Sequence, residues 1–343
     1  MKIALGSRPY DGPWGGGNRF IAALCDGLHA AGHIVVHNLK DNDIDFIVLT
    51  DPRSRSPNVC FGAGAILRYL ATTNSSAIVI HRINECDERK GEAFINAKLV
   101  RANYCADWTV FVGEWLTTLP IWREHLRTPW HTIRNGADTR IFNADGFAPW
   151  NGDGPLRLVT HHWGFHRMKG FDVYEAIDRA LDDPALAARF AFTYVGNLPK
   201  GFVFRNARYV TPLNGISLAA ELRAHHAYVT GSINEPGGNH QNEGALCGLP
   251  LLYRNSGCMP EYCTGFGLSY DGPQDIRATM ENLATEYRAL VDRMPAYPHT
   301  AERMIGEWIE LFEHVVGSRD ATLERRRPLL RRPAIWLRNM VPL

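Results

Sequence analysis

Two carboxylates frame a polar, glycine-rich segment in the second half of the chain: seven residues separate Glu235 from Glu243. Between them the chain reads Pro-Gly-Gly-Asn-His-Gln-Asn, in which almost nothing is apolar. Carboxylates accept hydrogen bonds from hydroxyls, glycines let a ligand approach the backbone, and amides at a helix N-terminus favour negative charge. The segment therefore has the chemistry to bind a molecule that carries hydroxyls and an anionic group. The structural alternative is an acidic first turn that caps the helix expected over 244–247.

A second polar cluster follows a short apolar run in the first half of the chain. Residues 77–80 have strand propensity, and His81, Arg82, Asn84 and Glu85 come directly after them. In a parallel sheet, side chains at the carboxyl end of a strand face the edge where ligands bind. We therefore expect this cluster to be functional. The alternative is an Arg82–Glu85 ion pair beside a histidine that caps the sheet.

A glycine-rich turn at 13–19 follows the first expected strand. Gly15, Gly17 and Phe20 approach the spacing of a dinucleotide fingerprint, which would indicate a dehydrogenase. However, Phe20 replaces the third small residue, and the turn begins too far from the strand for that motif. The pattern favours instead a flexible turn whose amides can approach an anionic ligand.

Alternating strand-like and helix-like segments must position these residues. In the first half, 17–31 has helical spacing, and short apolar runs at 3–5, 34–36, 46–49, 77–80 and 109–112 are typical of buried parallel strands. The same alternation restarts after 145–155, a linker rich in Gly, Pro and Asp. With 343 residues, the chain is long enough for two such domains. The sequence predicts an α/β fold with two tandem parallel-sheet units, whose ligands bind at the carboxyl ends of the strands.

Composition narrows the class of protein. The net charge of +1 argues against a nucleic-acid partner. The seven cysteines are scattered without a C-x-x-C pair, which favours free thiols in a reducing compartment over disulfides or a zinc site. No signal-peptide pattern and no run of about 18 apolar residues occurs. We expect a cytoplasmic protein, with peripheral association at the inner face of the plasma membrane as a further expectation.

That further expectation comes from the tail at 319–343, which places seven arginines among leucines, an isoleucine and Trp336. Only Asp320 and Glu324 oppose the positive charge. One interpretation is a solvated tail that packs on the first domain. The other is an anchor to an anionic membrane surface, although two prolines interrupt any single amphipathic helix.

Taken together, the motifs resemble those of retaining GT-B glycosyltransferases of the family 4 type. The resemblance covers roughly residues 1–316 and is most specific over 235–261. The matching segments, in chain order, are Gly15-Gly16-Gly17, Ile133-Arg134-Asn135-Gly136-Ala137-Asp138, Lys169-Gly170, Val195-Gly196-Asn197, Glu235-x7-Glu243, Gly248-Leu249-Pro250, and Gly257 with Pro260-Glu261.

The resemblance assigns roles to individual residues. It implies that Glu235 contacts the donor sugar, that Glu243 binds the ribose of the nucleotide, and that Lys169 binds the diphosphate, where a fixed cation stabilises the leaving group. His81 would lie near the donor sugar and the acceptor. Further donor-binding residues would be Gly16, Gly17, Arg167, Gly196, Asn197, Gly237, Gly238 and Asn239, and acceptor-side residues would be Asn18, Arg82 and Asn84.

One departure concerns the diphosphate. The family usually has an arginine five or six residues before the lysine, and this chain has Gly164 and Trp163 at those positions. Arg167 could substitute for it, one of the nearby histidines His161, His162 and His166 could assist, or loop amides could carry more of the charge.

The resemblance implies a GT-B fold, with two Rossmann-like parallel-sheet domains facing across a cleft. The expected parts are an acceptor domain at 1–148, a nucleotide-sugar domain at 155–300, a helix at 301–318 that packs back on the first domain, and the basic tail. The implied function is retaining sugar transfer from a nucleotide-diphosphate sugar to a glycan or lipid-linked glycan, without a cofactor or metal. The alternatives are a non-catalytic sugar-binding relative and a nucleotide-sugar epimerase. The sequence predicts neither the donor, the acceptor nor the oligomeric state.

Overall fold

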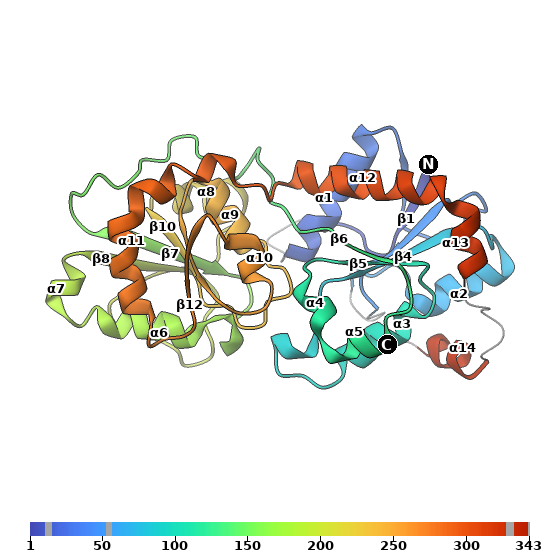
Figure 1. Ribbon diagram of the computed structural model, residues 1–343, viewed down its shortest axis with the longest axis horizontal. Helices are drawn as coiled ribbons and strands as arrows, with labels where there is room; N and C mark the ends of the chain where they lie inside the picture. The colour runs from blue at the N-terminus through green and yellow to red at the C-terminus, as the bar shows by residue number, and fades with distance from the viewer. Residues whose placement is uncertain (11–15, 53–56, 327–332, 342–343) are drawn as a thin grey trace. The chain divides into compact units, whose positions relative to one another are not determined.

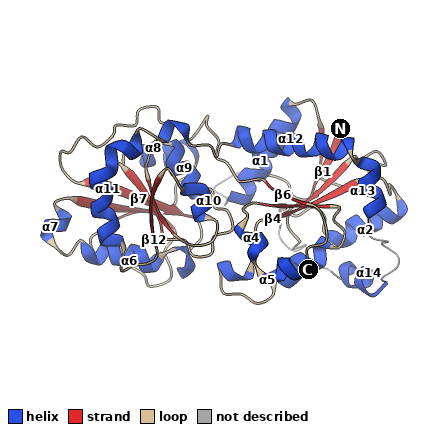
Figure 2. Cartoon of the chain, in the orientation of Figure 1, coloured by secondary structure: helices blue, strands red, loops and turns tan. Residues whose placement is uncertain are grey.

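The computed structural model describes residues 1–10, 16–52, 57–326 and 333–341, and the chain divides into two compact units. Unit 1 comprises the first strand, Gly17–Arg134 and the residues from Glu302 onward, and unit 2 comprises Asn135–Ala301. Each unit contains a six-stranded parallel sheet with helices on both of its faces (Figures 1 and 2). The predicted α/β class with two parallel sheets is confirmed.

The sheet of unit 1 has the strand order β2-β1-β3-β4-β5-β6. Its strands are β1 (Lys2–Leu5), β2 (Ile34–Val36), β3 (Phe46–Leu49), β4 (Ile78–Ile83), β5 (Trp108–Phe111) and β6 (Trp130–Thr132). Its helices are α1 (Gly16–Ala30), α2 (Ala63–Thr72), the short η1 (Asp87–Arg89), α3 (Ile95–Asn103), α4 (Trp115–Thr118), α5 (Pro120–His125), α12 (Ala301–Gly317), α13 (Arg319–Arg325) and α14 (Pro333–Met340).

The two faces of this sheet bury separate cores. Helices α1 and α12 cover one face, where Trp308 and Phe312 of α12 pack with residues of β1, β3 and β4. Helix α2 covers the other face, and Trp336 and Met340 of α14 pack against the same cluster. Burying one large apolar side chain contributes roughly 1.5–3 kcal/mol. The last helices of the chain are therefore part of the fold of unit 1.

The sheet of unit 2 has the order β12-β11-β10-β7-β8-β9. Its strands are β7 (Leu156–His162), β8 (Phe190–Gly196), β9 (Arg208–Val210), β10 (Ala227–Thr230), β11 (Leu251–Arg254) and β12 (Gly267–Tyr270). Its helices are η2 (Arg167–Lys169), α6 (Phe171–Ala180), α7 (Pro184–Ala187), α8 (Gly215–Arg223), α9 (His240–Leu246), α10 (Met259–Cys263), α11 (Ile276–Val291) and η3 (Met294–Ala296).

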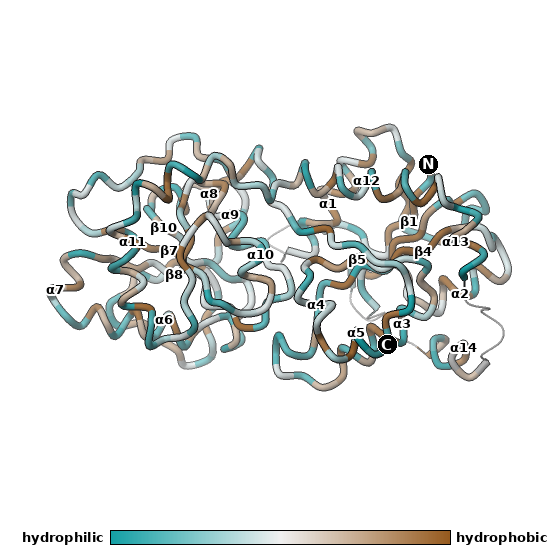
Figure 3. The backbone as a smooth tube through the Cα atoms, viewed as in Figure 1, coloured by the Kyte–Doolittle hydropathy of each residue, from teal (hydrophilic) through white to brown (hydrophobic). Residues whose placement is uncertain are grey.

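The central strands of both sheets consist largely of apolar residues, which Figure 3 colours brown. Strands covered on both faces need such continuous apolar runs, because neither face contacts water. In unit 2 the strand order reverses between β7 and β10. Ligands of doubly wound sheets bind at this switch point, beyond the carboxyl ends of the strands. A ligand site is therefore expected in the loops that follow β7 and β10.

The boundary between the units lies at Arg134–Asn135, earlier than residue 148, where the sequence analysis ended the first domain. The reason is that the segment after Arg134 folds on unit 2. The Asn135 backbone N–H donates to the Tyr262 hydroxyl at 2.9 Å. A Cβ on Gly136 would lie 2.0 Å from the Thr300 carbonyl oxygen, so only glycine permits this close packing.

Candidate donor site on unit 2

The loops after β7 and β10 meet at the switch point through a close backbone contact. Gly170 has φ +98°, and a Cβ on it would lie 2.4 Å from Gly231. Only glycine combines this conformation with this packing. Beside it, the Ile233 N–H donates to the Met168 carbonyl at 2.8 Å. These contacts fix the two loops against each other, so that the residues following them become neighbours.

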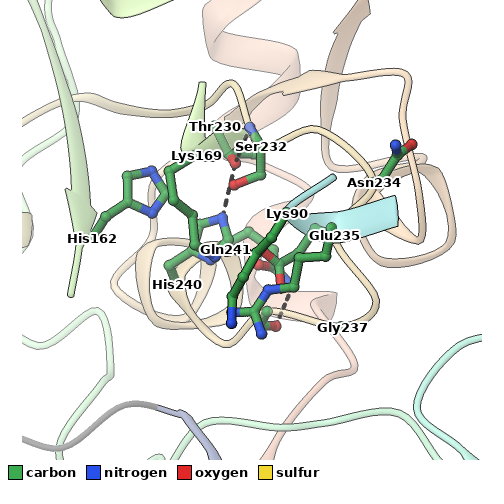
Figure 4. A network of polar contacts seen from close by, with 12 residues as sticks. Lys90, His162, Lys169, Thr230, Ser232, Asn234, Glu235, Gly237, His240 and Gln241 are labelled. Atoms are coloured by element: carbon green, nitrogen blue, oxygen red, sulfur yellow. Dashed lines mark hydrogen bonds and ion pairs between the residues drawn. The ribbon is translucent and has the colours of Figure 1, made fainter. Parts of the chain in front are cut away.

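Those neighbours are Lys169 and Glu235, which form a buried ion pair (Figure 4). The Lys169 Nζ lies 2.5 Å from the Glu235 Oε2, and the two side chains are only 8% and 4% exposed. Taking two charges out of water is costly, so such a pair persists only where the surrounding structure holds it. The structure thus brings together two residues that the sequence analysis assigned to donor binding.

The backbone of Glu235 is held by the segment that follows β11. The Cys258 N–H donates to the Glu235 carbonyl at 2.9 Å. Gly257 has φ +60°, and a Cβ there would lie 2.5 Å from the Glu235 nitrogen. The glycine of the Gly257/Pro260-Glu261 motif therefore has a physical function, because it lets this segment support the Glu235 backbone.

Side-chain amides hold the glycine loop after Glu235. The Asn135 Nδ2 donates to the Gly237 carbonyl at 2.5 Å, and the Gln241 Nε2 donates to the Gly238 carbonyl at 2.6 Å. A Cβ on Gly238 would lie 2.5 Å from the His240 Nδ1. With both carbonyls bound, the course of the loop is determined before any ligand arrives.

Helix α9 begins at His240, whereas the sequence analysis expected a helix from residue 244. The polar run His240–Glu243 forms its first turn and is buried, with Gln241 and Asn242 both 0% exposed. Burial of these side chains is possible because the structure supplies them with partners: Asn242, for example, donates to the Asn135 carbonyl at 2.9 Å and accepts from the Tyr297 hydroxyl at 2.6 Å. The prediction of a longer loop before the helix was wrong at this point.

Glu243 binds a histidine of the neighbouring strand. Its Oε2 lies 2.7 Å from the His161 Nε2, and both side chains are largely buried. Asn239, at the N-cap of α9, makes no side-chain cap hydrogen bond and accepts one from Asn242 at 3.3 Å. The carboxylate of Glu243 is thus oriented by β7.

Two neutral histidines, His162 and His240, lie near Lys169 of the ion pair. Burial, and after it the Lys169 ammonium, lowers the pKa of His240 to about 3. Burial also lowers the pKa of His162 well below its ordinary value, with His240 acting in the same direction. The two rings lie 4.7 Å apart, and their Nε2 atoms bind the hydroxyls of Thr230 (2.8 Å) and Tyr174 (2.6 Å). The Lys169 side chain therefore has uncharged polar groups near it (Figure 4).

The other predicted donor residues of unit 2 have varied surroundings. Arg167 is exposed, in the same turn as the buried Lys169. A Cβ on Gly196 would lie 2.1 Å from the His162 carbonyl oxygen, so this glycine permits close packing of β8 on β7. The Asn197 side chain donates to the Trp163 carbonyl at 2.8 Å and so ties together the loops after β7 and β8.

In unit 1, β4 extends to Ile83, so His81 and Arg82 lie within a strand and not beyond its end. Burial lowers the pKa of His81 to about 3, and its Nδ1 lies 3.2 Å from the Asn103 Nδ2. The Arg82 guanidinium stacks 3.6 Å from the centre of the Phe20 ring. The sequence analysis placed these residues after the strand because their polarity suggested an exposed loop.

The carboxylate of Glu85 lies 2.7 Å from the Arg89 guanidinium, four residues along the chain. This is a different partner from the Arg82 that the structural alternative proposed for it. Asn84 directly follows β4 and is half-buried.

The predicted glycine turn is only partly within the described residues, because Gly15 lies outside them. Gly16 and Gly17 begin α1. The Asn18 side chain binds both backbone groups of Tyr10: its Nδ2 donates to the carbonyl and its Oδ1 accepts from the N–H, each at 2.8 Å. Asn18 thus closes the connection between β1 and α1, a role that the sequence analysis did not foresee.

Of three further contributors to the site, Gln241 had no predicted role, Asn135 appeared only within a matching motif, and His161 only as one of the histidines that could assist at the diphosphate. The motif that contains Asn135 indicated that this residue matters, but it did not indicate that Asn135 binds the Gly237 carbonyl. The contacts of Asn135 and His161 join residues 102 and 82 positions apart, which local sequence patterns do not reveal.

No group of three or more His, Cys, Asp or Glu side chains among the described residues is arranged to hold a metal ion. The chain contains the Asp-x-Asp spacing at Asp41 and Asp43 and again at Asp43 and Asp45. The carboxylates of Asp41 and Asp43 contact the Lys2 ammonium, at 3.1 and 2.6 Å. Of the helices that the structure describes, none has the length and apolar character needed to cross a membrane.

Comparison with known proteins places the fold. No protein-family model matches the chain, and a search of curated proteins finds no sequence match. Among solved structures, the chain is similar to sucrose-phosphate synthase from Thermosynechococcus elongatus, with a TM-score of 0.64, 17% identity and coverage of 93% of this chain and 100% of that one. It is also similar to Anabaena Alr3699/HepE in complex with UDP, with a TM-score of 0.66, 12% identity and coverage of 92% and 100%.

A third similar structure is E. coli trehalose-6-phosphate synthase bound with UDP-2-fluoro glucose, with a TM-score of 0.65, 9% identity and coverage of 91% and 99%. At these identities the likeness concerns the fold. The chain has the two-unit α/β architecture of GT-B glycosyltransferases.

Proposed function

We propose that this protein is a retaining glycosyltransferase of the family 4 type, which transfers a sugar from a nucleotide-diphosphate sugar. The observation that carries the proposal is the buried Lys169–Glu235 pair at the switch point of unit 2. A cation and a carboxylate there match the two halves of such a donor, an anionic diphosphate and a hydroxyl-rich sugar. Several similar structures contain UDP or a UDP-sugar, so we propose a UDP-sugar as the first donor to test.

Each residue has a proposed task in donor binding. Lys169 binds the diphosphate, Glu235 accepts hydrogen bonds from sugar hydroxyls, and Glu243 accepts them from the ribose. The backbone N–H groups of Gly237, Gly238 and Asn239 donate to the sugar hydroxyls or the phosphate. The carbonyls of Gly237 and Gly238 are already bound, by Asn135 and Gln241. Asn18, Arg82 and Asn84 of unit 1 are proposed to serve the acceptor, and His81 is proposed to be catalytic, as are Glu235 and Lys169.

The chemistry we propose needs no protein nucleophile. The bond between the sugar C1 and the diphosphate oxygen breaks, and the acceptor oxygen forms its bond to C1 on the same face. The leaving diphosphate takes the proton of the acceptor hydroxyl, which balances the step. Lys169 stabilises the negative charge that grows on the diphosphate, so catalysis rests on positioning and electrostatics. We propose that the reaction is independent of metal, and full activity in EDTA would support this.

The test is UDP-sugar binding and transfer with the wild type, Lys169→Ala and Glu235→Ala. Binding of a UDP-sugar should raise the melting temperature of the wild type, and each variant should lose transfer. Full transfer by both variants would overturn the site assignment. Binding without any transfer or hydrolysis would favour a non-catalytic relative, and interconversion of the sugar without an acceptor would favour an epimerase.

We also propose that the acceptor is a glycan or lipid-linked glycan at the inner face of a membrane, reached through the basic tail. The structure shows which of the described tail residues are exposed and so available to contact a membrane. Arg326 binds Asp107 inside unit 1, whereas Leu337 and Arg338 of α14 are exposed. Arg327, Arg331 and Arg332 lie outside the described residues.

A further inference from the structure

The carboxylate of Glu243 is held from a neighbouring strand. The His161 Nε2 lies 2.7 Å from the Glu243 Oε2, and the two side chains are 11% and 2% exposed. His161 is the penultimate residue of β7, and Glu243 lies in the first turn of α9. The resemblance to known transferases assigned no such role to a histidine at this position.

His161 is in turn oriented by Tyr228 of β10. The His161 backbone N–H donates to the Tyr228 hydroxyl at 3.2 Å, and the His161 Nδ1 lies 3.2 Å from the same oxygen. Burial raises the pKa of Tyr228 well above its ordinary value, so this hydroxyl keeps its proton. The Tyr228 hydroxyl also donates to the His161 carbonyl at 3.3 Å, so it contacts both the ring and the backbone of His161. Because a carboxylate only accepts hydrogen bonds, the His161 Nε2–H is the donor to Glu243.

Close packing places α9 against this pair. A Cβ on Gly244 would lie 2.5 Å from the Tyr228 ring, so the residue after Glu243 presses directly on the tyrosine. The helix could not approach β10 this closely with a larger residue at position 244. The approach brings Glu243 within hydrogen-bond reach of His161.

We propose that His161 is a positioning residue that holds the Glu243 carboxylate for the ribose hydroxyls of the donor. This inference rests on the proposed function, in which Glu243 binds the ribose. A carboxylate fixed at one oxygen has lost its rotational freedom before the ligand binds, and that loss does not then weaken binding.

The test measures affinity by calorimetry for UDP, 2′-deoxy-UDP and 3′-deoxy-UDP. The proteins are the wild type, His161→Ala, His161→Gln, Glu243→Gln and the double variant His161→Ala/Glu243→Gln. We expect His161→Ala to bind UDP roughly 10- to 100-fold more weakly. Its affinity for at least one of the deoxy analogues should change much less. His161→Gln, whose amide can donate to Glu243, should recover part of the loss.

In the double variant, His161→Ala should add little to the effect of Glu243→Gln, because the histidine acts through that carboxylate. His225→Ala is a matched control. His225 is another buried histidine of unit 2, which binds the Glu221 carbonyl at 2.7 Å and the Thr193 hydroxyl at 2.8 Å. Its loss should lower stability without changing the preference for UDP over the deoxy analogues.

Two kinds of result would overturn the inference. Equal weakening of UDP and both deoxy analogues by His161→Ala, or full additivity with Glu243→Gln, would show that His161 does not act through the ribose contact. If the wild type binds none of UDP, ADP, GDP and CDP, the proposed function itself fails and the inference falls with it.

Discussion

Lys169 and Glu235, which are proposed to bind different halves of the donor, contact each other directly, with the Lys169 Nζ 2.5 Å from the Glu235 Oε2. The pair lies between the ends of β7 and β10, where backbone contacts of Gly170 with Gly231 hold the two loops together. Within the pair, each charge stabilises the other. A donor would replace this contact with its diphosphate and its sugar hydroxyls, so stability and donor binding depend on the same two side chains.

Removing one member of this pair should destabilise unit 2, whereas removing both charges should not. Lys169→Met or Glu235→Gln removes one charge of this buried pair and keeps the other, which costs about 3–5 kcal/mol. The double variant Lys169→Met/Glu235→Gln buries no charge and should regain most of that free energy of unfolding, yet bind no UDP-sugar. Urea unfolding and calorimetry measure the two quantities separately.

A control is the Arg254–Asp172 pair of unit 2, whose atoms lie 2.7 Å apart but in which Asp172 is 38% exposed. Asp172→Asn should cost less than about 1 kcal/mol, as for other exposed pairs, and should leave donor binding intact. Recovery of UDP-sugar binding by the double variant would contradict the proposed roles of Lys169 and Glu235.

Restoring a cation at residue 164 should strengthen binding of the diphosphate. A Cβ on Gly164 would lie 3.4 Å from the Lys169 Cε, so a side chain there begins beside the lysine. Gly164→Arg adds a second cation beside the proposed diphosphate site, and we expect UDP to bind roughly 3- to 10-fold more tightly at low salt. The gain should shrink as salt screens the charge.

The control for this substitution is Gly164→Gln, which adds a long polar side chain without the charge. It should not reproduce the gain. If Gly164→Arg and Gly164→Gln change the affinity for UDP equally, the diphosphate does not lie beside residue 164.

The sequence predicted the elements that have strong local patterns. The apolar runs at β3, β5 and β8 and the helical spacing of α1 and α6 are local properties, since continuous burial and amphipathic periodicity leave a direct signature. Only the resemblance between motifs predicted that Lys169 and Glu235 belong to one site. The ends of β4 and the start of α9 were misjudged, because polar residues such as His81 and Gln241 are buried there.

Such burial depends on partners that are distant in sequence. Gln241 is buried as part of a network in which Asn135 holds Gly237, and Glu243 is oriented by His161. Polar residues cost free energy when buried unless hydrogen bonds compensate. Local patterns cannot show this compensation, since it exists only once β7, β10 and the segment after Arg134 have come together.

His81 should make unit 1 less stable in acid. Its pKa of about 3 lies below the ordinary value of 6.5, so the unfolded chain binds more protons than the folded one between those values. Stability contributed by the neutral histidine is therefore present above about pH 6.5 and is lost as the pH falls towards 3. From pH 7 to pH 5 the expected loss is about 2 kcal/mol.

The measurement is urea unfolding of the wild type and His81→Gln at pH 7 and pH 5. Glutamine does not titrate, so the variant should lose about 2 kcal/mol less on acidification, whatever its stability at pH 7. An identical pH dependence of both proteins would show that His81 titrates alike in the folded and unfolded states.

Arg326 should be essential to unit 1, unlike Arg338 of the same tail. The Arg326 guanidinium donates to both Asp107 carboxylate oxygens, at 2.8 and 2.6 Å, and to the Ala77 carbonyl at 2.6 Å. Asp107 is 1% exposed, so Arg326→Gln leaves a buried carboxylate without its cation and should cost about 3–5 kcal/mol. Arg338 is exposed, and Arg338→Gln should change the free energy of urea unfolding by less than about 0.5 kcal/mol.

This difference decides how membrane binding should be tested. A truncation before residue 319 would remove Arg326 and damage the fold, so loss of binding would be ambiguous. The double variant Leu337→Glu/Arg338→Glu changes only exposed residues of α14. We expect the full chain to sediment with vesicles that contain anionic lipid, and the double variant to sediment much less, since each basic residue near such a surface contributes about 1 kcal/mol. Neutral vesicles serve as the control, because binding that does not depend on anionic lipid, or that survives the charge reversal, would rule out this surface as the anchor.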